Sequence, residues 1–210
     1  MKIVFAADPM CSWCYGFAKE LDDALAQLPQ VPFEIRMAGL WADGRQPLNA
    51  EAKAFRLSHW SRVEAAAGVP FNREAFLARQ NFLYNSEPIS RAFVAGVHLA
   101  PTASAIRLLR NLQQAFYVEG LDTTDVDVLG TALARALRDQ GLPHAAVHAR
   151  PALDFDLVHH IVRHDFLQVR DWGLTSFPKL LKVGQGTPEV LLAGFANTPE
   201  IVEVMARAMH

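Results

Sequence analysis

Residues 8–17, DPMCSWCYGF, contain both cysteines of the 210-residue chain and decide how the rest of it is interpreted. Cys11 and Cys14 are separated by two residues. The stretch directly before them, residues 3–7, is uniformly apolar, which is typical of a short strand covered on both faces. After them, apolar residues recur at spacings of three and four down to about Leu28, which predicts a helix. The pair therefore lies at a junction between a strand and a helix.

The two thiols are predicted to differ in exposure and in reactivity. Cys14 is the first residue of the buried stripe of the helix, whereas Cys11 lies where the helix begins and is expected to be the exposed thiol. A helix N-terminus carries about half a unit of positive charge and free backbone N–H groups, which can lower a thiol pKa from about 8.5 into the range of roughly 3.5–7.5. We therefore expect Cys11 to attack a disulfide, and Cys14 to attack the mixed disulfide that results.

Three alternatives to redox chemistry apply to the cysteine pair. A permanent structural disulfide would close a very small loop and so remove little chain entropy. Half of a zinc site would need two more ligands, and the chain has no second cysteine pair. The third alternative is two core cysteines without a chemical role. A CxxC pair at a strand-to-helix junction, in a chain with no other cysteine, favours redox chemistry over these three.

Residues 8–16, DPMCSWCYG, resemble the DsbA-like thioredoxin-fold oxidoreductases, in particular the FrnE-like branch, whose members are often labelled protein-disulfide isomerases. The resemblance implies an α/β thioredoxin fold (β-α-β … β-β-α) with a large all-helical insertion between the second and third strands. It also implies the strand order second, first, third, fourth, with the last two antiparallel. A sister branch, the kappa-class glutathione transferases and hydroxychromene-carboxylate isomerases, has Ser near this place. The two cysteines favour dithiol chemistry over that branch.

The middle of the chain fits this layout. Residues 31–37 alternate apolar and polar side chains, which predicts a half-covered edge strand parallel to the first. Residues 48–172 are helix-like almost throughout, with Asn72, Thr124 and Asp154 as expected helix caps and no flexible linker. We therefore expect a discontinuous thioredoxin-like domain and a helical insertion domain, formed by residues 1–44 with 173–210, and by residues 45–172.

The end of the chain returns to strands. Apolar residues on both sides of a turn at 184–187 predict an antiparallel hairpin. Asn197 or Thr198 is expected to cap a final helix that runs to about Met209. These elements supply the last two strands and the last helix of the implied fold.

A proline opens the predicted hairpin. The sequence alone argues weakly for a cis bond between Phe177 and Pro178, because only about 5–6% of X-Pro bonds are cis. Thioredoxin-like proteins carry a cis-proline beside the CxxC pair, and these two residues stand at the matching place. The resemblance implies that the Phe177 backbone pairs with an extended substrate segment, while Pro178 has no N–H and leaves the space beside Cys11 open. An ordinary edge-strand proline is the alternative.

Three further residues are candidates for the site. Ser12 and Trp13 lie between the cysteines and are expected to tune the redox potential, because residues there alter the stability of the thiolate. Trp41 lies in the loop 39–44 that leaves the C-terminal end of the second strand, where ligands tend to bind in open sheets. Trp41 either lines the site or is an ordinary packing tryptophan.

Composition and charge limit the partners. The chain is 51% hydrophobic and 20% charged, with a formal net charge of −2 and no basic run, so neither nucleic acid nor an anionic membrane is indicated as a partner. No apolar stretch approaches the roughly 20 residues that span a bilayer. Met1 and Lys2 lead directly into the first strand without a signal-peptide pattern, so we expect a cytoplasmic protein. In the cytosol a CxxC pair is more often catalytic or metal-binding than structural.

The predicted function is that of a thiol–disulfide oxidoreductase, acting on protein or small-molecule thiols and disulfides with an unidentified electron donor. No cofactor is expected, apart from glutathione as a candidate co-substrate. No metal is expected either: His160 and His164 are four residues apart on a predicted helix, but no further ligands complete a metal-binding signature. Two alternatives stay open: a glutathione-dependent isomerase or transferase related to hydroxychromene-carboxylate isomerase, and a thiol-metal binding protein.

Overall fold

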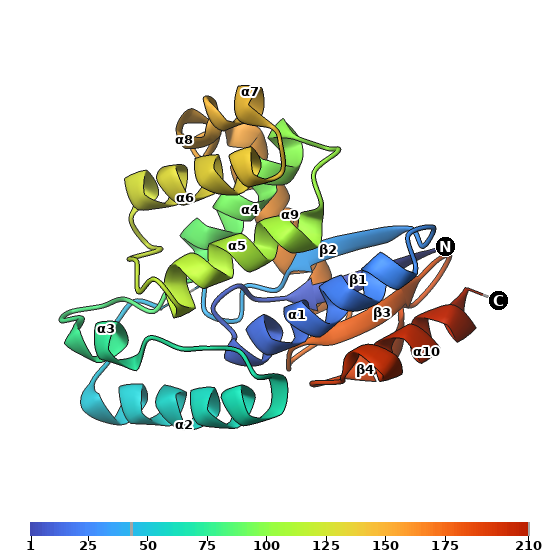
Figure 1. Ribbon diagram of the computed structural model, residues 1–210, viewed down its shortest axis with the longest axis horizontal. Helices are drawn as coiled ribbons and strands as arrows, with labels where there is room; N and C mark the ends of the chain where they lie inside the picture. The colour runs from blue at the N-terminus through green and yellow to red at the C-terminus, as the bar shows by residue number, and fades with distance from the viewer. Residues whose placement is uncertain (43, 210) are drawn as a thin grey trace.

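The computed structural model describes residues 1–42 and 44–209, and its centre is a four-stranded mixed sheet (Figure 1). β1 pairs in parallel with β2 and antiparallel with β3, and β3 pairs antiparallel with β4. The order across the sheet is β2-β1-β3-β4, so the thioredoxin fold and its expected strand order are confirmed. The strands are β1 (Lys2–Ala7), β2 (Phe33–Met37), β3 (Lys179–Val183) and β4 (Glu189–Ala193).

Most of the helices lie between β2 and β3 in the chain, as the predicted insertion requires. Whether they form a separate domain stays a prediction. The helices are α1 (Ser12–Gln27), α2 (Ala50–Ala67), α3 (Arg73–Ala78), α4 (Glu87–Leu99), α5 (Ala105–Tyr117), α6 (Val126–Asp139), α7 (Pro143–Ala146), α8 (Ala149–Ala152), α9 (Asp156–Asp171) and α10 (Thr198–Ala208).

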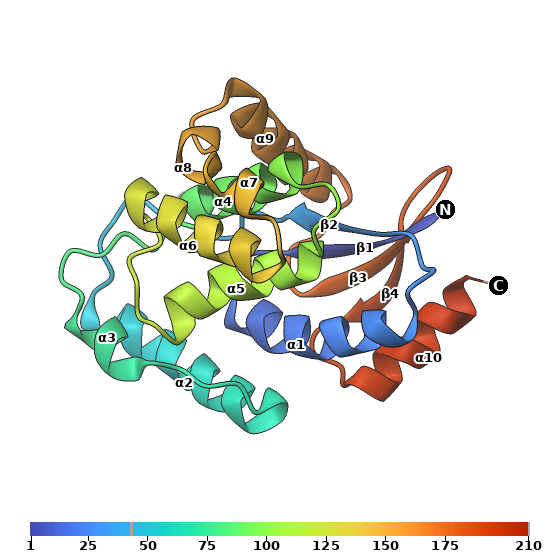
Figure 2. The same cartoon turned by 45° about the horizontal axis from the view of Figure 1, so that its top comes forward.

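The sheet is covered on both faces because side chains of β1 alternate between them. Ile3 and Phe5 are fully buried in the core that also contains α1 and α10. Val4 and Ala6 are equally buried on the opposite face, where they cluster with Val169 of α9. Figure 2 shows α1 and α10 on one side of the strands and α9 on the other. The uniformly apolar sequence of β1 follows from this double coverage.

The start of α6 differs from the prediction. Asp125 caps this helix, because its carboxylate accepts the backbone N–H groups of Asp127 and Val128. Thr124 was the expected cap, but its hydroxyl donates to the Asp122 carboxylate at 2.6 Å. An N-cap carboxylate that accepts two backbone donors stabilises the helix start more than a hydroxyl already engaged elsewhere.

The start of α9 also differs from the prediction, whereas α3 and α10 begin as expected. Phe155 occupies the N-cap of α9 without a side-chain hydrogen bond, and the expected cap, Asp154, pairs with Arg150 at 2.5 Å. Asn72 caps α3 through the N–H of Ala75. Asn197, rather than Thr198, caps α10, in a capping box with Glu200.

Close packing between α1 and α2 brings the insertion against the cysteine end of α1. A Cβ atom on Gly16 would lie 2.8 Å from Cγ1 of Val63, so only glycine allows this approach. The predicted loop 39–44 includes Asp43, which lies outside the described residues, as does His210 at the end of the chain. Within 1–42 and 44–209, none of the helices combines the length and the apolar character that crossing a bilayer requires.

Candidate active site around the cysteine pair

Cys11 is the N-cap residue of α1, with extended backbone angles of φ −84° and ψ 115°. Its N–H donates to the Asp8 carbonyl at 3.0 Å, and its own carbonyl accepts from Tyr15 at 3.1 Å. Both cysteines are free thiols. Cys11 is 8% exposed and Cys14 is not exposed at all. The predicted order of exposure is therefore right, but Cys11 is more covered than expected, and only a narrow part of it meets solvent.

The two motifs from opposite ends of the chain meet at the Cys11 sulfur. Cys11 Sγ donates to the carbonyl oxygen of Phe177 at 3.8 Å, across 166 residues of sequence. The bond between Phe177 and Pro178 is cis, and β3 follows it directly. The antiparallel pairing of β1 with β3 produces this contact, because it places the last residues of β1 beside the first residues of β3.

A buried carboxylate holds the cysteine loop in place, and the sequence analysis did not single it out. Asp8 is fully buried and accepts three hydrogen bonds: from the N–H of Met10 at 2.8 Å, the N–H of Trp41 at 3.2 Å and the hydroxyl of Ser86 at 2.6 Å. It therefore ties the loop after β1 to the loop after β2 and to the start of α4. Burial raises the pKa of Asp8, and these donors oppose the rise.

The environment of Cys14 suppresses its ionisation. Burial raises the pKa of the Cys14 thiol well above its ordinary value, and the adjacent Cys11 sulfur raises it further. A Cys14 thiolate inside the core would lack solvation, and a negative charge on Cys11 would repel it. At neutral pH Cys14 is therefore a protonated thiol behind the partly exposed Cys11.

This difference predicts selective alkylation of the reduced protein. At pH 7 iodoacetamide is expected to label Cys11 and leave Cys14 unmodified, because only a thiolate that reaches solvent reacts at an appreciable rate. Peptide mapping by mass spectrometry gives the site and number of adducts. The same protein in concentrated urea should gain two adducts. Equal rates at both cysteines in the folded protein would contradict the described burial.

A cavity of about 290 Å³ opens beside Cys11. Trp13 and Trp41 line it together with Phe177, so Trp41 lies in the first of its two predicted environments, at the wall of the site. The rings of Trp41 and Tyr84 are perpendicular, with centroids 5.6 Å apart. Ser12 also lines the cavity. The residues proposed from the sequence are thus brought together, although their chemical roles stay predictions.

Helix α2 supplies cavity residues that no local sequence pattern indicated. His59 accepts a hydrogen bond on Nδ1 from Trp13 Nε1 at 3.2 Å. Burial and the nearby Arg62 charge lower the pKa of His59, so the ring is neutral near pH 7 and can accept this bond. Arg56, one turn earlier, also lines the cavity. Only knowledge of how α2 folds back onto α1 could have identified these residues.

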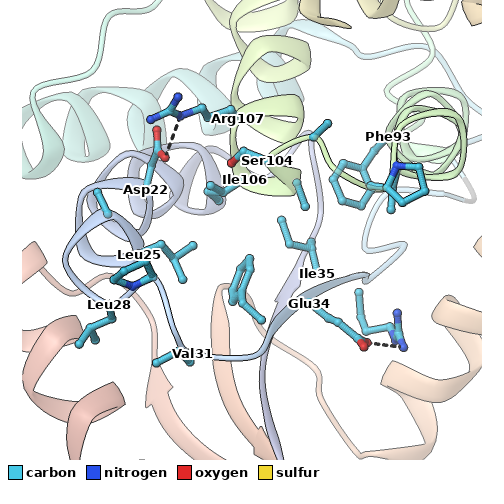
Figure 3. Close-up of a pocket in the computed structure, with 18 residues that line it drawn as sticks. Asp22, Leu25, Leu28, Val31, Glu34, Ile35, Phe93, Ser104, Ile106 and Arg107 are labelled. Atoms are coloured by element: carbon cyan, nitrogen blue, oxygen red, sulfur yellow. Dashed lines mark ion pairs between the residues drawn. The ribbon is translucent and has the colours of Figure 1, made fainter. Parts of the chain in front are cut away.

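A larger cavity of about 650 Å³ lies elsewhere, between α1, β2 and the loop before α5 (Figure 3). Apolar side chains such as Leu25, Ile35 and Phe93 form much of its wall. Asp22 pairs with Arg107 at its rim, at 3.6 Å. Neither cysteine lines it, so its size does not make it the site of thiol chemistry.

The described residues also contain no group of three or more His, Cys, Asp or Glu side chains placed so that they could hold a metal ion.

Three features define a thioredoxin-fold thiol protein: a strand, a CxxC pair at the start of a helix, and a carbonyl in contact with the first sulfur that directly precedes a cis-proline. Among solved structures, a candidate protein disulfide isomerase from Nitrosomonas europaea has 26% sequence identity and a TM-score of 0.84, covering 100% of this chain and 98% of that one. This similarity supports the resemblance of the chain to the DsbA-like thioredoxin-fold oxidoreductases. No protein-family model and no curated protein matches the chain.

Two more distant structures share the fold. The cytosolic disulfide reductase DsbM from Pseudomonas aeruginosa has 20% identity and a TM-score of 0.74, covering 100% of this chain and 97% of its own, and it is also known in a structure with GSH. A 2-hydroxychromene-2-carboxylate isomerase has 14% identity and a TM-score of 0.59, covering 99% of this chain and 94% of its own. At these identities the likeness concerns the fold alone.

Proposed function

We propose that the protein is a thiol–disulfide oxidoreductase of the FrnE-like branch that works through Cys11 and Cys14. The observation that carries the proposal is the contact between Cys11 Sγ and the carbonyl of Phe177 beside an open cavity. That contact puts the solvent-reaching sulfur next to the backbone that would align a substrate. Cys14 lies directly behind it, where it can reach a mixed disulfide but not the bulk solvent.

The proposed reaction has two exchange steps. The Cys11 thiolate attacks one sulfur of a substrate disulfide, forms a Cys11–substrate disulfide and releases the other substrate sulfur as a thiolate. The Cys14 thiolate then attacks Cys11 Sγ, closes the Cys11–Cys14 disulfide and releases the second substrate thiolate. Two electrons thus pass from the dithiol to the substrate. Two molecules of a thiol reductant, such as glutathione, return the protein to the dithiol form and leave as their disulfide.

The mixed disulfide also makes Cys14 easier to ionise. In the reduced protein the Cys11 sulfur is one of the causes that raise the pKa of Cys14. Once Cys11 is bonded to a substrate sulfur it carries no charge, and that contribution disappears. Burial, the largest cause of the raised pKa, remains, so the mixed disulfide removes only the part of the rise that is due to Cys11.

The other site residues have supporting roles in this proposal. Phe177 and Pro178 offer the substrate a docking edge, Trp41 walls the cavity, and Ser12 and Trp13 set the redox potential of the pair. Trp13 is oriented for that role by its hydrogen bond to His59. The cytosolic location of DsbM, which shares the fold, supports a cytoplasmic reaction in which glutathione supplies the electrons.

The test is turnover of a neutral small disulfide, hydroxyethyl disulfide, with glutathione as reductant and glutathione reductase with NADPH to monitor it. A rate above the uncatalysed reaction that falls when Cys14 is replaced by Ser supports dithiol cycling. The alternative, a glutathione-dependent isomerase, predicts instead that Cys14→Ser retains full activity on an aromatic chromene carboxylate. No turnover of any disulfide by the wild type would end the oxidoreductase proposal.

A further inference from the structure

The cavity beside Cys11 contains a cation that the two exchange steps do not use. We propose that Arg56 binds the carboxylate of a small anionic thiol or disulfide and so selects the substrates that reach Cys11. This inference rests on the proposed function and gives its substrate class: carboxylate-bearing molecules of low molecular weight, with glutathione and its disulfide as the natural probes.

Cation–π contacts with two aromatic rings restrain the guanidinium group of Arg56. Its central carbon lies 4.7 Å from the centre of the Trp41 ring and 4.2 Å from the centre of the Tyr84 ring. One Nη donates to the Ala52 carbonyl of the preceding turn at 3.0 Å. A guanidinium restrained by two aromatic rings loses little further freedom when it binds, and its planar donors match the two oxygens of a carboxylate.

The described lining of the cavity contains a positive charge and no negatively charged side chain to pair with it. Arg56 is the one described lining residue with a permanent charge, and no aspartate or glutamate is found in the described lining. No carboxylate of the described chain lies within 4.0 Å of Arg56, and its Nε is buried without a hydrogen-bond acceptor there. The other titratable base in the lining, His59, is held neutral by its lowered pKa.

Partial burial of the Arg56 guanidinium favours the binding of an anion. Burial lowers the pKa of Arg56, which reflects the free-energy cost of removing the guanidinium from water, although the group remains charged at any physiological pH. A ligand carboxylate that displaces the remaining water would recover part of that cost. An uncharged or cationic disulfide would not.

Tyr84 connects Arg56 to the cysteine loop. Arg56 lies over the ring of Tyr84, and the Tyr84 hydroxyl donates to the carbonyl of Met10 at 2.5 Å. Met10 directly precedes Cys11, and both line the same cavity of about 290 Å³. This volume is near the lower end of the roughly 300–1,000 Å³ typical of small-molecule sites, so we assign the occupant as a small molecule rather than a folded protein segment.

The first test measures binding without turnover. S-Methylglutathione keeps the carboxylates of glutathione but has no thiol to react, and calorimetry on the reduced protein gives its Kd. Replacing Arg56 by Met is expected to weaken this binding about 10- to 100-fold, the range of one charge-assisted hydrogen-bonded contact. Arg56→Lys should give an intermediate Kd, because the charge is kept and the planar pair of donors is lost. Arg207→Met is the matched control, because Arg207 is exposed on α10 and does not line the cavity, and this variant should bind as the wild type does.

A second binding experiment uses only the wild-type protein. The diethyl ester of S-methylglutathione lacks the carboxylate charges, and we expect the wild type to bind it at least about 10-fold more weakly than the acid. Equal binding of acid and ester would overturn the proposal even if Arg56→Met failed to fold. Unchanged binding of the acid by a folded Arg56→Met variant would overturn it as well.

Kinetics separate this proposal from the proposed function. With dithiothreitol as the reductant for both substrates, the ratio of kcat/KM for glutathione disulfide to kcat/KM for hydroxyethyl disulfide should fall about 10-fold or more in Arg56→Met, with the change mainly in KM. A wild type that turns over neither disulfide contradicts the oxidoreductase. A wild type that turns over both, with a ratio that Arg56→Met leaves unchanged, contradicts only the role of Arg56.

Discussion

Replacing Cys11 by Ser is expected to lower the rate of insulin-disulfide reduction to that of the uncatalysed reaction. Cys11 is the sulfur that reaches both solvent and the carbonyl of Phe177, and a serine hydroxyl does not ionise near neutral pH to attack a disulfide. Cys14 cannot replace it, because it is fully buried and its pKa is raised. The measurement is the turbidity of precipitating insulin B chain, with glutathione or dithiothreitol as reductant.

The matched control is Cys14→Ser, which keeps the attacking sulfur and removes the resolving one. This variant should still react with a disulfide but should accumulate as a mixed disulfide, visible in intact-protein mass spectrometry as the added mass of the substrate thiol. Circular dichroism of both variants confirms that they fold. Equal insulin reduction by the wild type and Cys11→Ser would contradict the assignment of the nucleophile.

Replacing Trp60 by Ala should cost about 3–5 kcal/mol in the free energy of unfolding, because it removes the largest buried side chain of the helical part. Trp60 is 1% exposed, and its ring centre lies 4.9 Å from that of Phe71, 4.6 Å from Phe76 and 5.3 Å from Tyr117. The residue also lines the cysteine cavity, so this aromatic cluster fixes α2 beside the site.

Urea unfolding followed by circular dichroism measures this loss. Phe55→Ala is the control on the same helix: Phe55 is 57% exposed, so its truncation should change the free energy of unfolding by less than about 1 kcal/mol. If Trp60→Ala unfolded at the same urea concentration as the wild type, the aromatic cluster would not be what stabilises the position of α2.

The two thioredoxin-like ends of the chain could be predicted from sequence because their signals are local. An apolar strand, a CxxC pair and a helical stripe are contiguous, and the cis-proline follows from where the resemblance places Phe177 and Pro178. The contact at Cys11 then depends only on strand order, which the family implies. This is why a pair of residues 166 positions apart could be placed together in advance.

The contribution of the helical part to the site could not be predicted in this way. Arg56 and His59 reach the cavity only because Gly16 lets α2 pack closely on α1, and a glycine in a helical stretch does not reveal its partner. Asp8 stands inside the quoted motif, but its role comes from donors in two other loops. The wrong caps have a similar origin: Thr124 and Asp154 are good cap residues whose side chains are engaged by other neighbours.

The most direct test of the central claim is a redox titration of the wild-type protein in buffers of reduced and oxidised glutathione, followed by acid quenching and labelling of the remaining thiols with a large maleimide. We predict that both thiols disappear together in one two-electron transition, whose midpoint gives the potential of the Cys11–Cys14 couple. Thiols that persist in fully oxidising buffer, or that disappear independently of each other, would contradict a dithiol–disulfide centre at this site.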